Sequence, residues 1–329
     1  MIIYRSASTD PAWNLALEEF FFRRIPAGQS FCMLWQNHNT VVIGKNQNTL
    51  QEIDSDYVEQ QGIRVVRRLS GGGAVYHDLG NLNFTFITDA PENGQIDLHR
   101  FCVPIAETLR SFGVEAVISG RNDITVDGKK FSGNAQYVQN GRVMHHGTMM
   151  FDSDLTVLSH VLRPDPDKIA SKAIRSVSSR VTNLKSYLPA DVSMEQFIER
   201  LLQYLSVQEP AEYISLTEAE LEDIRCRKES RYDTWEWNWG RSPAFSWRGG
   251  RRIEGCGRVN LQLRVDAGCI RDLQISGDFF GNRDIRELCG VLDGCPFRRD
   301  AVVKRLQETD LESYIHNISA EAFSSLLPA

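Results

Sequence analysis

Two arginines and three successive glycines form the stretch of the chain best suited to chemistry, at residues 67–73. Glycine backbone reaches φ values that other residues avoid, and its N–H groups approach a ligand closely. Successive N–H groups form a concave anion site, and Arg67 and Arg68 add fork-shaped hydrogen bonds to phosphate or carboxylate oxygens. The spacing matches neither the P-loop nor the dinucleotide fingerprint. We therefore expect an anion site of another architecture; the alternative is a glycine-rich hairpin with solvated arginines.

Lys130 is the second candidate, because it lies just past the tight turn that Asp127 and Gly128 indicate. A two-residue loop places Thr125 opposite Lys130, and Asp123 opposite Ser132. A solvated edge lysine is the usual interpretation of such a position. Alternation along the strands instead predicts a polar face and an apolar face. The polar face is expected to carry Asp123, Thr125, Lys130, Ser132 and Asn134, and the apolar face Ile124, Val126, Phe131 and Tyr137.

Together, the arginines, the glycines and Lys130 suit chemistry on a phosphate beside a carboxylate. When a nucleotide activates a carboxylate, one anion attacks another, and fixed cations and N–H groups offset the repulsion. Mg²⁺ is expected on the phosphates, and Asp123 is a candidate ligand.

Two adjacent histidines follow in the same region. A regular strand would place His145 on the polar face and His146 opposite, unless a bulge near Gly133 reverses them. Because neighbours on a strand point to opposite faces, they cannot share one metal ion, so we expect positioning roles. The seven cysteines show no metal-ligand spacing, and none lies between Cys102 and Cys226. They are typical of reduced thiols in a cytoplasmic protein.

The surrounding pattern predicts the elements that hold these residues. Asp10 and Pro11 begin a helix over 12–22, and a 3–4 apolar repeat predicts another over 98–112. Residues 121–151 are predicted to be a three-stranded meander. Short strands are expected at 32–35, 40–43, 63–66, 84–87, 259–265 and 273–275, and further helices at 194–205, 216–227 and 284–292.

Composition sets the class of protein. The chain has 329 residues, of which 42% are hydrophobic and 24% charged, with a net charge of −6. These values indicate a globular protein without a chain-wide nucleic-acid role, and no apolar run has membrane-spanning length. We expect a mixed α/β (α+β) catalytic domain over residues 1–243 and a small α+β domain over 246–329.

The ordered motifs resemble the lipoate–protein ligase A family along nearly the whole chain. The resemblance is carried by residues 10–16, 41–44, 67–81, 120–123, 130–135, 145–148, 178–184 and 235–238. It implies a catalytic domain with mixed and antiparallel sheets, shared with biotin ligases. It also implies activation of lipoate with Mg-ATP to lipoyl-AMP. The lipoyl group would pass to a lysine on lipoyl domains of 2-oxoacid dehydrogenase acyltransferase subunits, or on the glycine-cleavage H protein.

The resemblance also implies roles for individual residues. Lys130 is expected to be catalytic, contacting both lipoate and nucleotide, and Asp123 is expected to contact the metal or the nucleotide. A basic loop with Lys168 and Lys172 resembles a segment that closes over the adenylate. The expected ATP contacts are Arg68, Gly73, Ala74, Val75, Tyr76 and Lys130, and the expected lipoate contacts are Lys130, Arg67, Gly72, His77 and His146.

Two related activities stay open. An octanoyltransferase needs no ATP, and its cysteine-dependent variants are disfavoured because the meander has no cysteine. A lipoyltransferase that uses preformed lipoyl-AMP would share the same loop. A biotin ligase is disfavoured because its glycine loop has a Gly-Arg-Gly pattern. A non-catalytic carrier role is disfavoured because the loop and Lys130 are intact.

Overall fold

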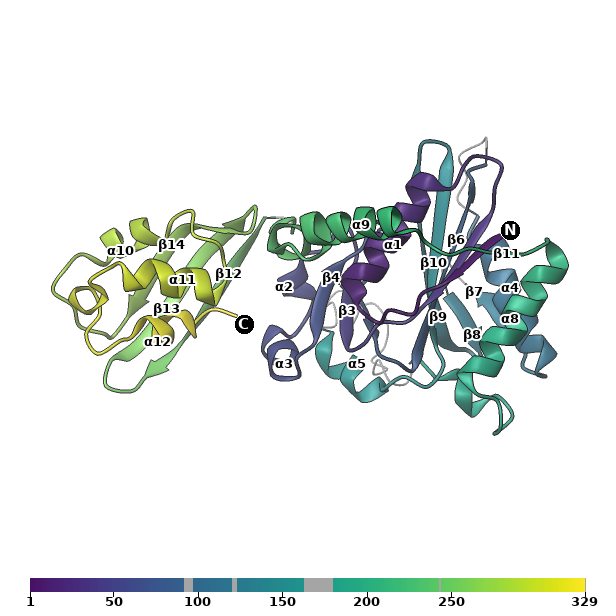
Figure 1. Ribbon diagram of the computed structural model, residues 1–329. Coiled ribbons are helices and arrows are strands. Elements are labelled where there is room, and N and C mark those ends of the chain that lie inside the picture. The colour runs from purple at the N-terminus through teal and green to yellow at the C-terminus, as the bar shows by residue number, and fades with distance from the viewer. Residues whose placement is uncertain (92–96, 120–122, 163–179, 243, 329) are drawn as a thin grey trace. The chain divides into compact units, whose positions relative to one another are not determined.

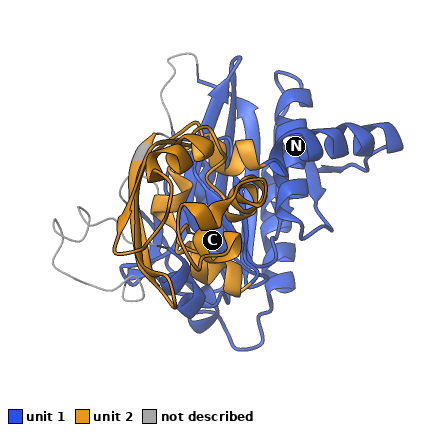
Figure 2. Cartoon of the chain, turned by 90° about the vertical axis from the view of Figure 1, so that its left-hand side faces the viewer, with its two compact units in different colours: residues 1–47, 62–234 blue, residues 48–61, 235–329 orange. Residues whose placement is uncertain are grey.

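The computed structural model describes residues 1–91, 97–119, 123–162, 180–242 and 244–328. The expected basic loop with Lys168 and Lys172 lies outside these ranges. Two compact units make up the described chain, as Figure 2 shows: residues 1–47 with 62–234, and residues 48–61 with 235–329. The second unit therefore includes a short segment from the first quarter of the sequence. The predicted domain division at residues 243–246 stays a prediction.

An eight-stranded mixed sheet forms the centre of the first unit, in the order β11-β1-β2-β6-β10-β9-β8-β7 (Figure 1). Its first four strands in sequence are β1 (Ile2–Arg5), β2 (Phe31–Trp35), β6 (Asn81–Asp89) and β7 (Val117–Ser119). The others are β8 (Asp123–Val126), β9 (Lys129–Gln139), β10 (Arg142–Met150) and β11 (Glu212–Tyr213). The meander predicted at 121–151 is present as β8, β9 and β10, which pair antiparallel.

The two faces of this sheet are covered by different helices. Helices α4 (His99–Ser111) and α8 (Met194–Gln208) pack on one face and complete the main apolar core with Phe101, Ile105 and Phe197. Helix α1 (Pro11–Arg24) covers the other face, and α9 (Glu218–Arg227) lies beside it (Figure 1). As predicted, Asp10 accepts a hydrogen bond from the Ala12 N–H, and Pro11 begins α1.

A small second sheet carries the glycine loop. It has the order β4-β3-β5, with strands β3 (Thr40–Ile43), β4 (Arg64–Arg67) and β5 (Val75–His77). β3 is parallel to β4 and antiparallel to β5, so the loop over residues 68–74 crosses the end of the central strand. Helix α5 (Leu155–Val161), the 3₁₀ turn η1 (Leu184–Ser186) and the π-helix η2 (Lys228–Tyr232) complete the unit.

The second unit has a three-stranded antiparallel sheet: β12 (Phe245–Ile253), β13 (Gly257–Asp266) and β14 (Cys269–Gly277). One sheet face packs against α10 (Ile285–Leu292), α11 (Arg299–Gln307) and α12 (Ala320–Ser324) around Leu261, Leu288 and Phe323. Helices α2 (Thr49–Glu52) and α3 (Ser55–Gln60) belong to this unit, as do η3 (Glu236–Gly240) and η4 (Leu311–Ser313).

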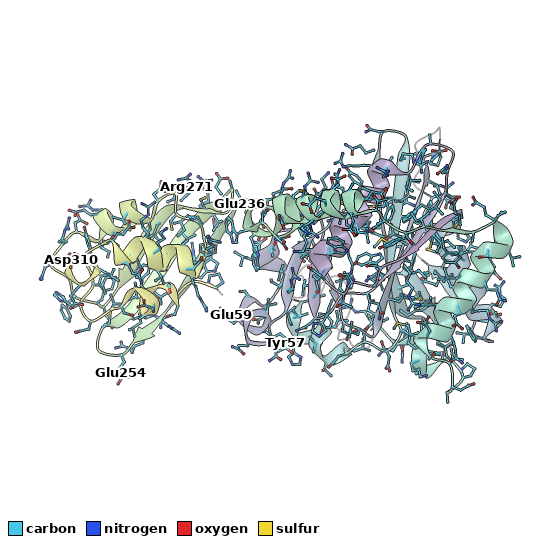
Figure 3. The ribbon with its side chains drawn as sticks, viewed as in Figure 1. Tyr57, Glu59, Glu236, Glu254, Arg271 and Asp310 are labelled. Atoms are coloured by element: carbon cyan, nitrogen blue, oxygen red, sulfur yellow. The ribbon has the colours of Figure 1, made fainter. Side chains whose placement is uncertain are left out.

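Side-chain contacts hold the early segment within the second unit. The Thr49 hydroxyl donates to the Asn238 carbonyl, and Arg299 forms ion pairs with Asp56 and Glu59 of α3. Figure 3 labels Glu59 on this segment, and it shows Glu254 and Asp310 pointing away from the sheet of the unit. No helix within the described ranges has both the length and the apolar character needed to cross a bilayer.

Candidate active site

Arg68 fixes the shape of the glycine loop through hydrogen bonds to the loop backbone. Its buried guanidinium donates to Ser70 Oγ at 3.0 Å, Val42 O at 3.1 Å, Gly71 O at 2.7 Å and Gly73 O at 2.8 Å. Burial lowers the pKa of Arg68 to about 10, so the side chain keeps its charge at neutral pH. The loop carbonyls are thereby drawn towards a fixed positive charge.

Arg67 serves a different purpose from its neighbour. It is 1% exposed and donates to three carbonyl oxygens after β3, those of Gly44 at 2.9 Å, Lys45 at 3.2 Å and Gln47 at 2.7 Å. These bonds fix the chain as it leaves the small sheet. The structure does not bring Arg67 to the cleft, where the sequence analysis expected a lipoate contact.

Only one glycine of the three, Gly72, has the left-handed backbone expected of such a loop, with φ of 93°. Gly44 is needed for a close approach, because a Cβ there would lie 2.1 Å from Gly72 O. At Gly71 and Gly73 a Cβ would meet no atom within 4 Å among the described residues. The fold therefore does not need glycine at these two positions, and the missing side chains leave room for a ligand.

A cleft of about 620 Å³, including its part open to solvent, lies between the glycine loop and the large sheet. Eight of the predicted site residues line it: Arg68, Gly72, Gly73, Ala74, Val75, His77, Lys130 and His146. Tyr76 does not; its hydroxyl donates to Asn39 Oδ1 at 3.1 Å. Lining residues that the sequence analysis did not single out for this role are Leu15, Trp35, Val42, Asn83, Gly133, Asn134, Ala135, Gly147 and Thr148.

Lys130 reaches the cleft from β9, where it pairs with Thr125 as predicted. The predicted pairing of Asp123 with Ser132 is wrong, because the register shifts by one residue and Asp123 pairs with Gly133. Phe131 is the extra residue of this bulge, and both Phe131 and Ser132 are fully buried. The bulge therefore removes Ser132 from the face that carries Lys130.

The Lys130 ammonium lies over Gly133 and forms an ion pair of 2.7 Å with Asp123. Both side chains are about one-third exposed, at 35% and 37%. The Lys130 carbonyl accepts a hydrogen bond from Thr182 N at 2.9 Å, so the strand is braced by the segment that starts at residue 180. Asp123 is next to the cleft but outside its lining, and the described residues contain no cluster of three or more metal-ligating side chains.

Asn134 is also displaced from the predicted polar face. Its Oδ1 lies 3.2 Å from His145 Nε2, and its Nδ2 donates to Ser132 Oγ at 3.3 Å. His145 stacks on Phe101 of α4, with ring centroids 4.7 Å apart. The side chains of His145, Asn134 and Ser132 therefore lie on the α4 face, and Asn134 also borders the cleft. The bulge reverses the predicted orientation of the two histidines, so that His146 lies on the cleft face. Tyr137 also lies on the cleft face, against Phe22 of α1, contrary to its predicted apolar grouping with Ile124.

A buried chain of hydrogen bonds joins the floor of the cleft to the glycine loop. Trp35 Nε1 donates to Thr85 Oγ1 at 2.9 Å, and the Thr85 hydroxyl donates to Glu18 Oε1 at 2.7 Å. The same carboxylate oxygen is 2.8 Å from His146 Nδ1. His146 Nε2 is 2.5 Å from Ser70 Oγ, which accepts from Arg68.

Glu18 is the charged residue of this hydrogen-bond network that the sequence analysis missed. It is 1% exposed, and it follows Leu15 by three residues on the face of α1 that meets the cleft. The available signal was a carboxylate at helical spacing among large apolar residues of a buried helix. Phe22, four residues later, packs on Tyr137 of β9, so the same helix face runs along the sheet.

His77 lies at the end of β5 and is 2% exposed. Its Nδ1 is 3.2 Å from Asn37 Nδ2, and its ring meets Trp35 edge-on at 6.1 Å. Burial, with Arg68 and His146 nearby, lowers the pKa of His77 to about 3. His77 is therefore a neutral imidazole at physiological pH.

Known proteins give the same assignment as the motifs. Residues 10–206 match the lipoyl protein ligase A/B catalytic domain, and residues 242–327 match the bacterial lipoate protein ligase C-terminus. Lipoate-protein ligase LplJ of Bacillus subtilis is 43% identical over 322 residues, which cover 97% of each chain. Lipoate–protein ligase 1 of Staphylococcus aureus is 39% identical, again over 97% of each chain. The chain therefore belongs to the lipoate–protein ligase family.

Solved structures confirm the expected fold class. A bipartite lipoate protein ligase from Thermoplasma acidophilum, studied with its E2 lipoyl domain, has a TM-score of 0.62 at 29% identity. The match covers 73% of this chain and 95% of that one. A lipoate-protein ligase A bound with ATP also has a TM-score of 0.62, at 27% identity over 73% of this chain and 97% of that one.

Proposed function

We propose that this cleft activates lipoate with ATP and that the chain then transfers the lipoyl group to a lysine of an acceptor protein. One observation carries the proposal: the glycine loop and Lys130, which lie far apart in the sequence, line the same cleft. The chain acts as an ATP-dependent lipoate–protein ligase.

Adenylation joins a lipoate carboxylate oxygen to the α-phosphorus of ATP and releases pyrophosphate. Both reactants are anions, so the Lys130 ammonium offsets their repulsion where they meet. The phosphates fit the open space at Gly71 and Gly73. The hydrogen bonds from Arg68 to the Gly71 and Gly73 carbonyl oxygens keep the loop in this shape. Preorganised charges of this kind contribute more to the rate than mobile ones because they need no reorganisation.

Mg²⁺ would supply further charge neutralisation on the phosphates when bound. It usually keeps several waters and takes one or two carboxylates from a protein, together with phosphate oxygens. Asp123, beside the cleft and partly exposed, fits that need as a single carboxylate. Before the nucleotide binds, the same carboxylate holds the Lys130 side chain over Gly133.

The apolar part of the cleft suits the acyl chain of lipoate. Leu15, Trp35 and Val42 line it, and His77 and His146 lie beside them. In the second step the acceptor lysine amine attacks the acyl carbon and AMP leaves. The acceptors we propose are lipoyl domains, in 2-oxoacid dehydrogenase acyltransferase subunits and in the glycine-cleavage H protein. The seven free thiols support a reducing compartment, the cytoplasm.

Lipoate-dependent exchange of pyrophosphate into ATP tests the first step. We expect exchange with the purified chain and lipoate, and lipoylation of a lipoyl domain when one is added. Absence of exchange together with transfer from supplied lipoyl-AMP would identify a lipoyltransferase instead. Acyl transfer from an octanoyl donor without ATP would identify an octanoyltransferase.

A further inference from the structure

A buried ring nitrogen on the wall of the cleft has no hydrogen-bond partner among the described residues. His77 Nε2 is buried, and none of the described residues forms a hydrogen bond with it. It belongs to a residue that lines the cleft. A buried polar atom without a partner costs stability, so it marks a place where a ligand completes the hydrogen bonding.

The direction of this hydrogen bond follows from backbone groups nearby. Asn14 Nδ2 is 2.9 Å from both the Ser8 and the Gln36 carbonyl oxygens, so this atom must be the amide nitrogen. The Asn37 atom 3.0 Å from this nitrogen is therefore Oδ1, because two amide nitrogens would present only N–H groups to each other, and Asn37 Nδ2 is turned towards His77 Nδ1. Since Nδ1 accepts, the proton of the neutral ring is on Nε2. His77 presents a donor.

The register of the large sheet places this donor at the end of the cleft away from Lys130. Trp35 pairs with Asn83, and Asn83 pairs with Thr148. The Gly133 N–H donates to Thr148 Oγ1, and Lys130 lies over Gly133. Three strand spacings separate β2 from β9, which is roughly 14 Å. The His77 ring contacts Trp35, at the β2 end of this row.

A second polar group lies along the same row. Asn83 is 1% exposed and lines the cleft; its Oδ1 accepts from Asn81 Nδ2 at 2.9 Å. Its Nδ2 has no hydrogen-bond partner within the described part of the chain. The end of the cleft that receives the far end of an acyl chain is therefore not purely apolar.

We propose that His77 Nε2–H, supported by Asn83, selects an acyl tail that ends in hydrogen-bond acceptors over one that ends in hydrocarbon. This inference rests on the proposed function, and it assigns the two ring sulfurs of lipoate as the acceptors. Sulfur accepts hydrogen bonds weakly, so the selection is modest. An octanoyl tail supplies no acceptor and leaves both buried donors unpaired, which lowers its affinity.

A shape-matched analogue isolates the hydrogen bond from the fit. 5-Cyclopentylpentanoate has the chain and ring size of lipoate, with methylenes in place of both sulfurs. We expect the wild-type chain to bind lipoate about three to ten times more tightly by calorimetry, with the same ratio in kcat/KM for pyrophosphate exchange. Equal affinities for the two acids would overturn the proposal without any variant being needed.

Variants then assign the difference to His77. His77→Phe keeps a ring against Trp35 but has no donor, and we expect the ratio to fall close to one through weaker lipoate binding. His77→Gln restores an N–H group and part of the ratio. His145→Phe is the matched control, because His145 is equally buried but lies on the α4 face. It should leave the ratio unchanged.

The outcomes distinguish a failure of the proposed function from a failure of the role proposed for His77. No exchange with lipoate in the wild type would refute the proposed function. Exchange with lipoate, together with a wild-type ratio retained in His77→Phe, would refute only the role of His77. A change of the ratio in His145→Phe as large as that in His77→Phe would also count against it.

Discussion

The two faces of the large sheet use adjacent histidines in different ways. His145 is buried on the α4 face, where its hydrogen bonds reach Asn134 and Ser132 on one side and Gln136, which also donates to the Asp97 carbonyl, on the other. His146 is buried on the α1 face, where the hydrogen-bond chain runs from Trp35 to Arg68 under the glycine loop. Both residues are buried histidines. They differ in what their hydrogen-bond networks reach, and only the network of His146 leads to the glycine loop of the candidate active site.

The largest expected effects compare adjacent residues of β9. Lys130→Ala should lower the rate of pyrophosphate exchange by about 10²–10³, as for the loss of one preorganised donor, with little change in stability. Phe131→Ala, on the opposite face and fully buried, should cost about 3–5 kcal/mol of unfolding free energy. Exchange assays and urea unfolding measure the two quantities.

Lys129→Ala is the matched control, since Lys129 is exposed and precedes the candidate residue. It should leave both quantities near their wild-type values. Near-normal exchange in Lys130→Ala would remove the basis for treating this face as catalytic.

The hydrogen-bond chains give the next largest effects. Glu18→Leu leaves the His146 Nδ1–H and the Thr85 hydroxyl without their acceptor, and should cost about 2–4 kcal/mol of unfolding free energy. It should also lower exchange per folded molecule, because Ser70 and Arg68 lose their support. Gln136→Leu on the α4 face should cost about 1–2 kcal/mol and leave exchange per folded molecule unchanged. Loss of exchange in Gln136→Leu would show that the hydrogen bonds on the α4 face also affect activity, contrary to this prediction.

Acid should destabilise both faces through a graded effect. Burial lowers the pKa of both His77 and His145 to about 3, against an ordinary value of 6.5. The unfolded chain therefore takes up these protons first, and stability is lost as pH falls from about 6.5 towards 3. Each histidine contributes about 1.4 kcal/mol per pH unit within this window. Denaturant unfolding at several pH values should show a shallower slope in His77→Phe and in His145→Phe; an unchanged slope would contradict this prediction.

The smallest effect on stability is expected at Asp123. Its ion pair with Lys130 is partly exposed, so Asp123→Asn should change the unfolding free energy by less than about 1 kcal/mol. Pyrophosphate exchange should need more Mg²⁺ if Asp123 contacts the metal. Asp127→Asn, at the adjacent turn, is the control because Asn also tolerates its positive φ of 48°. An unchanged Mg²⁺ requirement would limit Asp123 to positioning Lys130.

Local patterns were sufficient to predict the meander and the helices that pack on it, but not which side chains lie on each face of the sheet. Alternating residues and the Asp127–Gly128 turn predicted the meander, and Asp10–Pro11 predicted the start of α1. The bulge at Phe131 reversed the side of every later residue on β9 and β10, because side chains alternate with a period of two. A bulge depends on how the strand fits its neighbours, and Gly133 was a signal only for its approximate place.

The lining of the cleft was predicted where the motif is continuous in sequence and missed where it is not. Arg68, Gly73 and Lys130 belong to recognisable segments. Trp35 and Asn83 come from neighbouring strands, and only their pairing brings them to one row. Arg67 and Arg68 have the same type and charge, and only the chain path after β3 decides which one faces the cleft.

The glycine loop and Gly44, which lies against it, are under two kinds of evolutionary constraint. At Gly44 any side chain collides with the Gly72 carbonyl, so substitutions should be lost through misfolding whatever the substrate. At Gly71 and Gly73 a methyl group has space in the folded chain, so selection would act through activity alone. In a mutational scan with separate readouts, substitutions at Gly44 should therefore lower abundance, and substitutions at Gly71 and Gly73 should lower activity alone. A lineage that no longer needed the reaction would be free to change Gly71 and Gly73 while it kept Gly44.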